Sequence, residues 1–243
     1  ESFSNAVQIF KKLERKKNIL ICSHGMGLVY TCIGQNQKTI EIYKQMKPIA
    51  KEIQDEGMIN FGNNLIGIEY FEGQEYDKAL KIFLDLISYA DSRSSTDFRA
   101  WVYMNIGLTY YYKKEYNKSN EKFNIAYDIT SKLGMLNETI WSLSWMILSG
   151  IKINKLDQSE NLKFIHEKID QSWLKDIDYP EINYVLSIIY LELQNSVKSK
   201  LHLDNAYKKL IEISKTIKNK EYKHSFLRAR FHNEIVEAWE QNN

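Results

Sequence analysis

The sequence has very few residues that interrupt helices. Only two of its 243 residues are proline, Pro48 and Pro180, and ten are glycine. A chain of many short strands needs such residues at its turns, so their scarcity argues against a β-sandwich or a β-barrel. It favours long helices joined by short turns, in a chain long enough to bury a substantial core.

Cysteine is equally scarce, because Cys22 and Cys32 are the only two. Two thiols cannot form the disulfide framework of a small secreted domain, so we expect a reducing compartment, the cytoplasm. If both lie on one helix, they are about 15 Å apart along its axis, too far for a mutual disulfide or a shared metal. We therefore expect two buried thiols without a chemical role.

Neither sign of charge dominates, since 33 Lys and Arg residues oppose 31 Asp and Glu residues and give a net charge of +2. This balance provides no global attraction to nucleic acid or to an anionic membrane. Residues 19–37 carry no charge, but their several polar side chains predict a buried helix and not a transmembrane one. Glu212 and Glu221 interrupt the lysine-rich segment 208–223, so we interpret it as a solvated helix face and do not expect nucleic acid as a partner.

The stretch Cys22–Tyr30, CSHGMGLVY, contains the residue types of two kinds of active site but not their spacing. Tyr30 stands where a dinucleotide-binding loop needs its third glycine. On a helix, the side chains of Cys22 and His24 diverge by about 200°, so they cannot act as nucleophile and base. We interpret the stretch as part of a packed helix.

The segment HEKID at 166–170 is similar to a zinc-protease helix, but Asp170 replaces the second histidine. One histidine does not supply the ligand set of a tetrahedral zinc site, so a solvated helix face is the better interpretation. The remaining histidines have no ligand spacing. We therefore expect no catalytic residue, no metal site and no cofactor, which means that the chain is not an enzyme.

A repeat of forty residues runs through the middle of the chain. Each unit has a glycine, a tyrosine three residues later, a small residue after twelve and an aromatic residue after sixteen. The four positions are occupied in turn by Gly27, Tyr30, Thr39 and Tyr43; by Gly67, Tyr70, Ala79 and Phe83; and by Gly107, Tyr110, Ser119 and Phe123. We expect a helical hairpin in each unit, with the glycine and the small residue at the closest approach of its two helices.

The repeat predicts one solenoid over residues 1–243. The expected hairpins are 18–55, 56–93, 96–134, 137–173 and 178–218. Residues 1–16 are expected to be the second helix of a truncated repeat, so the chain is predicted to be part of a longer protein. Residues 219–240 are expected to cap the array, because the stretch 225–240 spaces its apolar residues four apart on one helix face. Those residues are Leu227, Phe231, Ile235 and Trp239.

Local signals agree with several of these boundaries. Asp178 followed by Pro180 is typical of a helix start, and Gly134 suits a helix end. We expect a helix to end near residue 134 and another to begin near residue 180.

This pattern resembles the tetratricopeptide repeat, whose first helix carries Leu-Gly-x-x-Tyr and whose second carries Ala and Phe. The matching segments are Met26-Gly27-x-x-Tyr30, Ile66-Gly67-x-x-Tyr70 and Ile106-Gly107-x-x-Tyr110. The usual repeat has about 34 residues, so forty implies longer helices, similar to those of bacterial signalling proteins. The usual tryptophan of the first helix is absent. The resemblance implies an all-α fold, a right-handed α-α superhelix of about five hairpins.

The resemblance also implies that the first helices line a concave groove in which ligands lie. The expected groove residues are His24, Leu28, Asn64, Ile68, Phe71, Met104, Leu108, Tyr111, Tyr112, Trp145, Ser149 and Tyr184. This set is apolar and aromatic, which suits an apolar peptide or an amphipathic helix. The alternative, left open by the sequence, is that several of these residues are core between neighbouring units.

The sequence therefore predicts a non-enzymatic domain that binds a protein or peptide, as the sensor or scaffold of a larger bacterial signalling protein. One alternative is the ligand domain of a peptide-responsive transcription regulator that lacks its DNA-binding module. Others are a homo-oligomeric structural scaffold, or an enzyme whose site lies between repeats. No membrane contact is expected from any of these.

Overall fold

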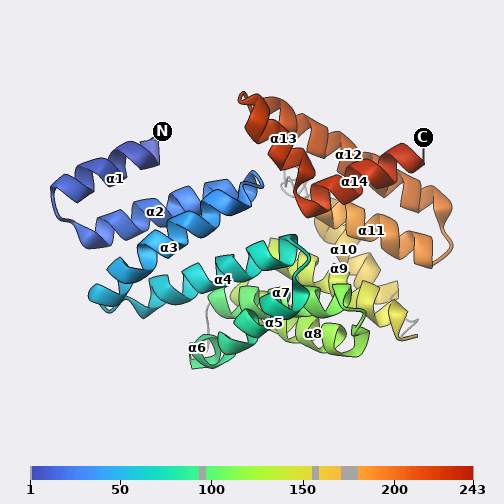
Figure 1. The fold of residues 1–243 in the computed structure, drawn as a ribbon. Helices are drawn as coiled ribbons and strands as arrows, with labels where there is room; N and C mark the ends of the chain where they lie inside the picture. The colour runs from blue at the N-terminus through green and yellow to red at the C-terminus, as the bar shows by residue number, and fades with distance from the viewer. Residues whose placement is uncertain (1, 93–96, 155–158, 171–179, 243) are drawn as a thin grey trace.

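The computed structural model describes residues 2–92, 97–154, 159–170 and 180–242, and these ranges contain helices and turns but no strand (Figure 1). The helices in order are α1 (Ser2–Lys12), α2 (Lys16–Cys32), α3 (Asn36–Glu52), α4 (Glu56–Glu72), α5 (Tyr76–Asp85), α6 (Ile87–Ser92), α7 (Asp97–Tyr112), α8 (Tyr116–Leu133), α9 (Leu136–Lys152), α10 (Ser159–Asp170), α11 (Pro180–Glu192), α12 (Ser196–Thr216), α13 (Lys220–Arg228) and α14 (Arg230–Gln241). The predicted all-α solenoid is confirmed.

Two of the expected helix boundaries, near residues 134 and 180, lie within the described residues and agree with the structure. Gly134 follows α8 in a left-handed conformation, with φ of 68°, which is the helix end that the sequence indicates. Pro180 is the first residue of α11. The expected cap at Asp178, and the hairpin boundaries at 93, 96, 173 and 178, lie outside the described residues.

The turns between consecutive helices share one geometry. A residue with φ between 53° and 68° recurs at positions 14, 34, 54, 74, 114, 134, 154 and 194, which are separated by twenty residues or by forty. The next N–H then bonds to the carbonyl five residues back, as from Glu75 to Tyr70 at 2.8 Å and from Glu115 to Tyr110 at 2.9 Å. This bond closes the end of each helix. A helix and its turn thus occupy twenty residues, which is why the hairpin repeats every forty.

The repeated glycines lie where the two helices of a hairpin approach most closely. A Cβ at Gly27 would lie 2.6 Å from the ring of Tyr43, and one at Gly67 would lie 2.5 Å from the ring of Phe83. Both rings are buried. An alanine at either glycine would force the aromatic side chain away and separate the helices.

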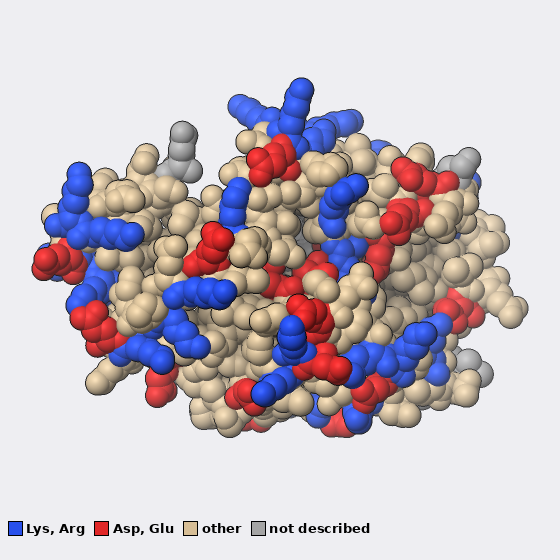
Figure 2. All heavy atoms as spheres, in the orientation of Figure 1, with Lys and Arg blue, Asp and Glu red and all other residues tan. Residues whose placement is uncertain are grey.

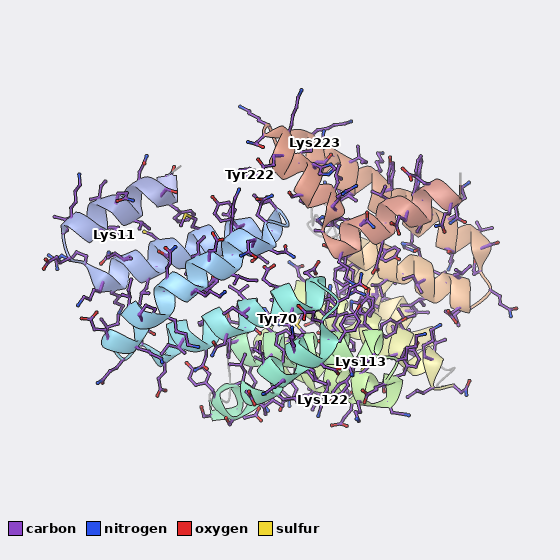
Figure 3. The ribbon with its side chains drawn as sticks, viewed as in Figure 1. Lys11, Tyr70, Lys113, Lys122, Tyr222 and Lys223 are labelled. Atoms are coloured by element: carbon purple, nitrogen blue, oxygen red, sulfur yellow. The ribbon has the colours of Figure 1, made fainter. Side chains whose placement is uncertain are left out.

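The solenoid curves until its last helices meet its first complete hairpin (Figure 1). The side-chain amide of Gln35, in the turn between α2 and α3, donates to the hydroxyl of Ser225 on α13. The rings of Tyr30 and Tyr222 have centroids 6.3 Å apart, and Figure 3 shows Tyr222 directed from α13 toward α2 and α3. Segments almost two hundred residues apart in sequence therefore contact one another.

The C-terminal cap is two helices and not one. The four-residue spacing predicts one continuous helix that carries Leu227 and Phe231. The helix is interrupted at Ala229, where φ is −55° and ψ is 143°. The break frees the N–H of Arg230 from the helix, and this group donates instead to the carboxylate of Glu72 at 3.0 Å. The expectation of one helix over 225–240 is therefore wrong, because a contact with α4 outweighs the local pattern.

The expectation of two buried thiols is also wrong. Cys22 is half-buried and Cys32 is exposed. Cys32 is the last residue of α2 and lines a cavity between α2, α4 and α14. Its side chain is exposed because this cavity leaves one side of the helix end without neighbouring residues.

The surface matches the balanced charge of the sequence. On the face shown in Figure 2, basic and acidic side chains are interspersed, and lysines project from the end of α13. Within the described ranges, no helix combines the length and the hydropathy that crossing a lipid bilayer requires.

Candidate functional site

The first helices of the hairpins line the inner surface of the solenoid, and this surface has two portions. Seven of the twelve expected groove residues are largely enclosed by other helices: Phe71, Leu108, Tyr111, Tyr112, Trp145, Ser149 and Tyr184. Five line an open cleft: His24, Leu28, Asn64, Ile68 and Met104. We refer to these as the covered portion and the open cleft.

The first turn of α14 fills the covered portion. The ring of Phe231 lies 5.9 Å from the ring of Trp145 and 6.3 Å from that of Tyr112, measured between centroids. Trp145 also packs against Tyr111, at 5.0 Å, and is only 1% exposed. Phe231 therefore occupies the place beside these aromatic residues that an external ligand would need.

Arg230 contributes a charge to the same aromatic cluster. Its guanidinium lies 3.6 Å from the ring centroid of Tyr112 and 4.8 Å from that of Phe71. Its Nε donates to Glu234 at 3.2 Å, and the Tyr112 hydroxyl donates to the same carboxylate at 3.0 Å. A guanidinium stacked on aromatic faces and paired with a carboxylate holds this turn of α14 in place.

The open cleft lies along the other end of the same helices and has a volume of about 320 Å³. Its lining residues are His24, Leu28, Phe61, Asn64, Leu65, Ile68, Trp101, Met104, Asn105 and Trp141. They come from α2, α4, α7 and α9, so four successive first helices contribute. A cleft of this size with aromatic walls and few polar groups is typical of a ligand-binding site.

The sequence contains a signal for three lining residues that the groove prediction did not include. Phe61, Trp101 and Trp141 are forty residues apart, and Phe61 and Trp101 each precede the packing glycine of their unit by six residues. The forty-residue period therefore predicts an aromatic residue at this place on α4, α7 and α9, although Ile21 occupies it on α2. The groove prediction also missed Leu65 and Asn105, which are forty residues apart and share a second place in the repeat.

Two amides lie in this otherwise apolar cleft. The Nδ2 of Asn105 donates to the Oδ1 of Asn64 at 3.1 Å. This bond leaves the Nδ2 of Asn64 and the Oδ1 of Asn105 without a partner among the described residues. A donor and an acceptor held side by side match the acceptor and donor of a peptide bond.

His24 is a neutral group at the rim of the cleft. Its Nδ1 lies 2.8 Å from the hydroxyl of Tyr43, and burial lowers the pKa of its imidazole. The cleft therefore holds no side chain that is charged at neutral pH.

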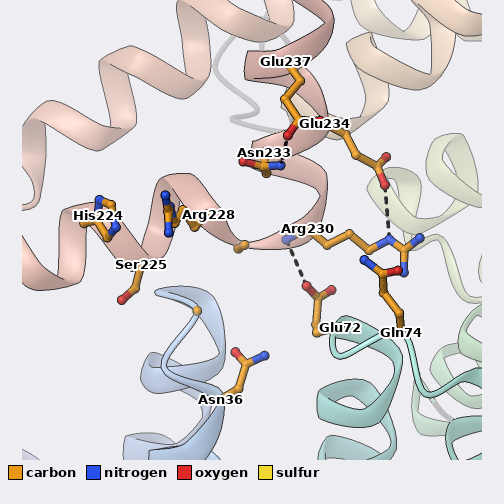
Figure 4. A pocket seen from close by; sticks show the side chains of 12 residues that line it. Asn36, Glu72, Gln74, His224, Ser225, Arg228, Arg230, Asn233, Glu234 and Glu237 are labelled. Atoms are coloured by element: carbon orange, nitrogen blue, oxygen red, sulfur yellow. Dashed lines mark hydrogen bonds and ion pairs between the residues drawn. The ribbon is translucent and has the colours of Figure 1, made fainter.

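A smaller cavity of about 150 Å³ adjoins the cleft, and Ile68 lines both. Its wall carries the carboxylates of Glu69, Glu72 and Glu181, together with Arg230 and His232 of α14. We refer to it as the acidic chamber. Gly34, Asn36, Glu72, Ala229 and Arg230 line both the chamber and an outer cavity of about 550 Å³, shown in Figure 4.

Glu69 is the most unusual residue of the chamber. It is 4% exposed; its Oε1 accepts from the Thr31 hydroxyl at 3.2 Å, while its Oε2 has no hydrogen-bond partner among the described residues. Burial raises the pKa of Glu69 to about 7, although the bond from Thr31 opposes the rise. Glu69 therefore titrates much closer to neutral pH than an exposed carboxyl group does.

His232 is held between two acceptors on the same wall. Its Nε2 lies 3.3 Å from Glu181 and its Nδ1 lies 2.7 Å from the carbonyl of Phe226. Burial lowers the pKa of His232, but Glu181, Phe226 and Glu72 together outweigh burial and raise it.

The described residues contain no group of three His, Cys, Asp or Glu side chains arranged to hold a metal ion.

No protein-family profile matches this chain, and no curated protein matches it in sequence. Solved structures do match. BtubC (BKLC) from P. vanneervenii is 14% identical, with a TM-score of 0.63 over 90% of this chain and 92% of its own. The apo form of RapI is 17% identical, with a TM-score of 0.66 over 91% of this chain and 82% of its own. At these identities the likeness shows a shared helical-repeat fold of the tetratricopeptide type.

Proposed function

We propose that this chain is a non-enzymatic peptide-binding domain whose ligand lies in the open cleft. The observation that carries the proposal is the cleft itself: aromatic and aliphatic walls from four successive first helices, with one paired amide site between them. Apolar side chains of a peptide would pack against Trp101, Met104 and Trp141 in the cleft. The free donor and acceptor of Asn64 and Asn105 would bind one of its peptide groups.

The architecture supports a role as a sensor within a larger signalling protein. The cleft and the closure by α13 and α14 share two helices, because α2 and α4 line the cleft and also contact the C-terminal helices. A ligand that draws α2 toward α7 changes the distance between α2 and α13. Binding in the cleft would therefore shift the population between closed and opened forms of the solenoid.

A random library of synthetic octapeptides, equilibrated with the immobilised protein, tests the proposal. Leu28 is 42% exposed at the edge of the cleft, so Leu28→Glu places a charge there without disturbing the core. Leu201→Glu is the matched control, because Leu201 is 55% exposed on α12 and lines no part of the cleft. We expect wild type and Leu201→Glu to retain the same apolar peptides and Leu28→Glu to lose them.

Two results would contradict the proposal. One is retention by wild type no greater than by the empty support. The other is equal retention by all three proteins, with folding of each verified by circular dichroism, because the peptides would then bind elsewhere.

A further inference from the structure

The acidic chamber lies beside the open cleft and beside the outer cavity. Ile68 separates the chamber from the cleft and lines both. On the other side, Glu72 and Arg230 line both the chamber and the outer cavity, where α13 and α14 face the turn between α2 and α3 (Figure 4). A peptide in the cleft that extends one end past Ile68 would reach the chamber.

The charges on the chamber wall do not balance. His232 is paired with Glu181, at 3.3 Å, and Arg230 is paired with Glu234, at 3.2 Å. Glu69 and Glu72 form no ion pair among the described residues; Glu72 accepts only the main-chain N–H of Arg230. The wall therefore presents two carboxylates that form no ion pair, although the charges of Arg230 and His232 act on Glu72 from a greater distance.

Glu69, which lines this space, additionally has one carboxylate oxygen without a partner among the described residues. Its Oε2 is buried and has no hydrogen-bond partner among the described residues, although Oε1 is bonded to Thr31. A buried polar atom without a partner destabilises a protein, and such atoms are rare in folded chains. A ligand that donates hydrogen bonds and carries positive charge would satisfy this oxygen and offset both unpaired carboxylates.

We propose that the acidic chamber binds a cationic group of the peptide, its terminal ammonium or a basic side chain, through Glu69 and Glu72. This inference rests on the proposed function, since the cleft holds the remainder of the peptide. The chamber volume of about 150 Å³ admits one ammonium or guanidinium group with its adjoining methylene groups and excludes a larger side chain. The ligand is therefore an apolar peptide with a single cationic group at or near one end.

The binding of this group depends on pH. The groups that face Glu69 are Tyr43 on α3, Cys32 on α2, Glu72 on α4, Glu181 on α11, and Arg230 and His232 on α14. Burial raises the pKa of Glu69 to about 7, and only its ionised form attracts a cation. Deprotonation of His232 on the same wall removes a positive charge, so both titrations strengthen cation binding as the pH rises.

Three octapeptide libraries made without Lys and Arg test the inference. The first has free N-termini, the second is N-acetylated, and the third is N-acetylated with one lysine at a fixed position. Retention is measured at pH 6 and pH 8 on wild type, Glu69→Gln and the control Glu41→Gln, whose carboxylate is exposed on α3. The first and third libraries distinguish a terminal ammonium from a basic side chain.

We expect wild type and Glu41→Gln to retain one of the two cationic libraries about tenfold better than the neutral library at pH 8. Glu69→Gln should lose most of this preference and retain the neutral library like wild type. From pH 6 to pH 8 the preference of wild type for the lysine library should increase about tenfold, because a group with a pKa near 7 passes from about one-tenth to about nine-tenths ionised. For the library with free N-termini the increase should be smaller, because an α-amino group with a pKa of about 7.7–8.0 loses part of its own charge over the same range.

The outcomes separate this inference from the proposed function. Equal retention of neutral and cationic libraries by wild type would overturn the cationic site and leave peptide binding intact. A cationic preference that Glu69→Gln retains in full would also overturn it. Failure of all three libraries to bind wild type would overturn both proposals.

Discussion

The covered portion and the open cleft are built from the same helices, yet the first is core and the second is surface. Helix α4 contributes Phe71 to the covered portion and Ile68 to the cleft, less than one turn away. Helix α7 likewise contributes Tyr112 to one and Met104 to the other. The repeat alone does not distinguish them. The difference is the first turn of α14, which reaches only one end of the inner surface.

This comparison shows that an apolar residue on the inner face of a repeat has two possible partners. In the covered portion the partner is the chain itself, through Phe231 and Arg230. In the open cleft, no described residue from another part of the chain covers the lining side chains as Phe231 and Arg230 do in the covered portion. Predictions that perturb the covered portion should therefore change stability, whereas those that perturb the cleft should change binding.

The largest expected effect is at Trp145. We expect Trp145→Ala to lower the free energy of unfolding by about 3–5 kcal/mol, because it leaves a cavity among buried aromatic rings. Leu28→Ala, in the cleft, should lower it by less than about 1 kcal/mol, because Leu28 is already partly exposed. Urea denaturation measures both. Similar losses of unfolding free energy in the two variants would contradict the distinction between the covered portion and the open cleft.

The next effect concerns the chamber beside the cleft. Burial raises the pKa of Glu69 from its ordinary value of 4.5 to about 7 in the folded state. The folded protein therefore holds a proton that the unfolded chain releases, so stability falls as the pH rises from about 4.5 to 7. We expect Glu69→Gln to be more stable than wild type by up to about 3 kcal/mol at pH 8, with the difference vanishing near pH 4.5. Urea denaturation at both pH values measures it, and a Glu69→Gln variant less stable at pH 8 would contradict it.

A smaller effect tests the contact that positions α13. Gly34 and Gly134 both have φ of 68°, but a Cβ at Gly34 would lie 2.7 Å from the carbonyl oxygen of Ser225, whereas a Cβ at Gly134 would meet nothing within 4 Å. We expect Gly134→Ala to lose about 1 kcal/mol from backbone strain. Gly34→Ala should lose roughly 2–3 kcal/mol, because it also separates α13 from α2. Thermal unfolding of the pair measures the difference, and equal losses would show that this contact contributes nothing to stability.

The smallest effect is at the surface of the same closure. Glu221 lies 3.7 Å from Lys38, and both side chains are well exposed. We expect Glu221→Gln to change the free energy of unfolding by less than about 0.5 kcal/mol, because solvent screens exposed ion pairs. A larger loss in urea denaturation would show that the closure depends on charge more than on the packing at Gly34.

The sequence was sufficient to predict the repeat. The spacing of Gly27 and Tyr43, and of Gly67 and Phe83, is a local consequence of helix geometry, because the aromatic ring packs where the glycine has no side chain. For this reason the all-α solenoid and its forty-residue period could be predicted from residue types alone.

The division of the inner surface could not be predicted in the same way. This division depends on the interruption of the helix at Ala229. The local spacing does not indicate the interruption, because Leu227 and Phe231 fit one face of a continuous helix. The break is stabilised by Glu72, which lies about 158 residues earlier in the sequence. Nothing in the sequence around Glu72 indicates that its carboxylate accepts a hydrogen bond from the N–H of Arg230. The raised pKa of Glu69 likewise depends on burial by helices that only the folded chain brings together.

Hydrogen–deuterium exchange with the octapeptides retained by wild type tests the central claim most directly. The account predicts slower exchange in the segments of α4 and α7 that line the cleft, around residues 61–68 and 101–105, and no change in the first turn of α14. Protection confined to α14, or to the outer helices of the hairpins, would contradict the claim that the open cleft binds the peptide.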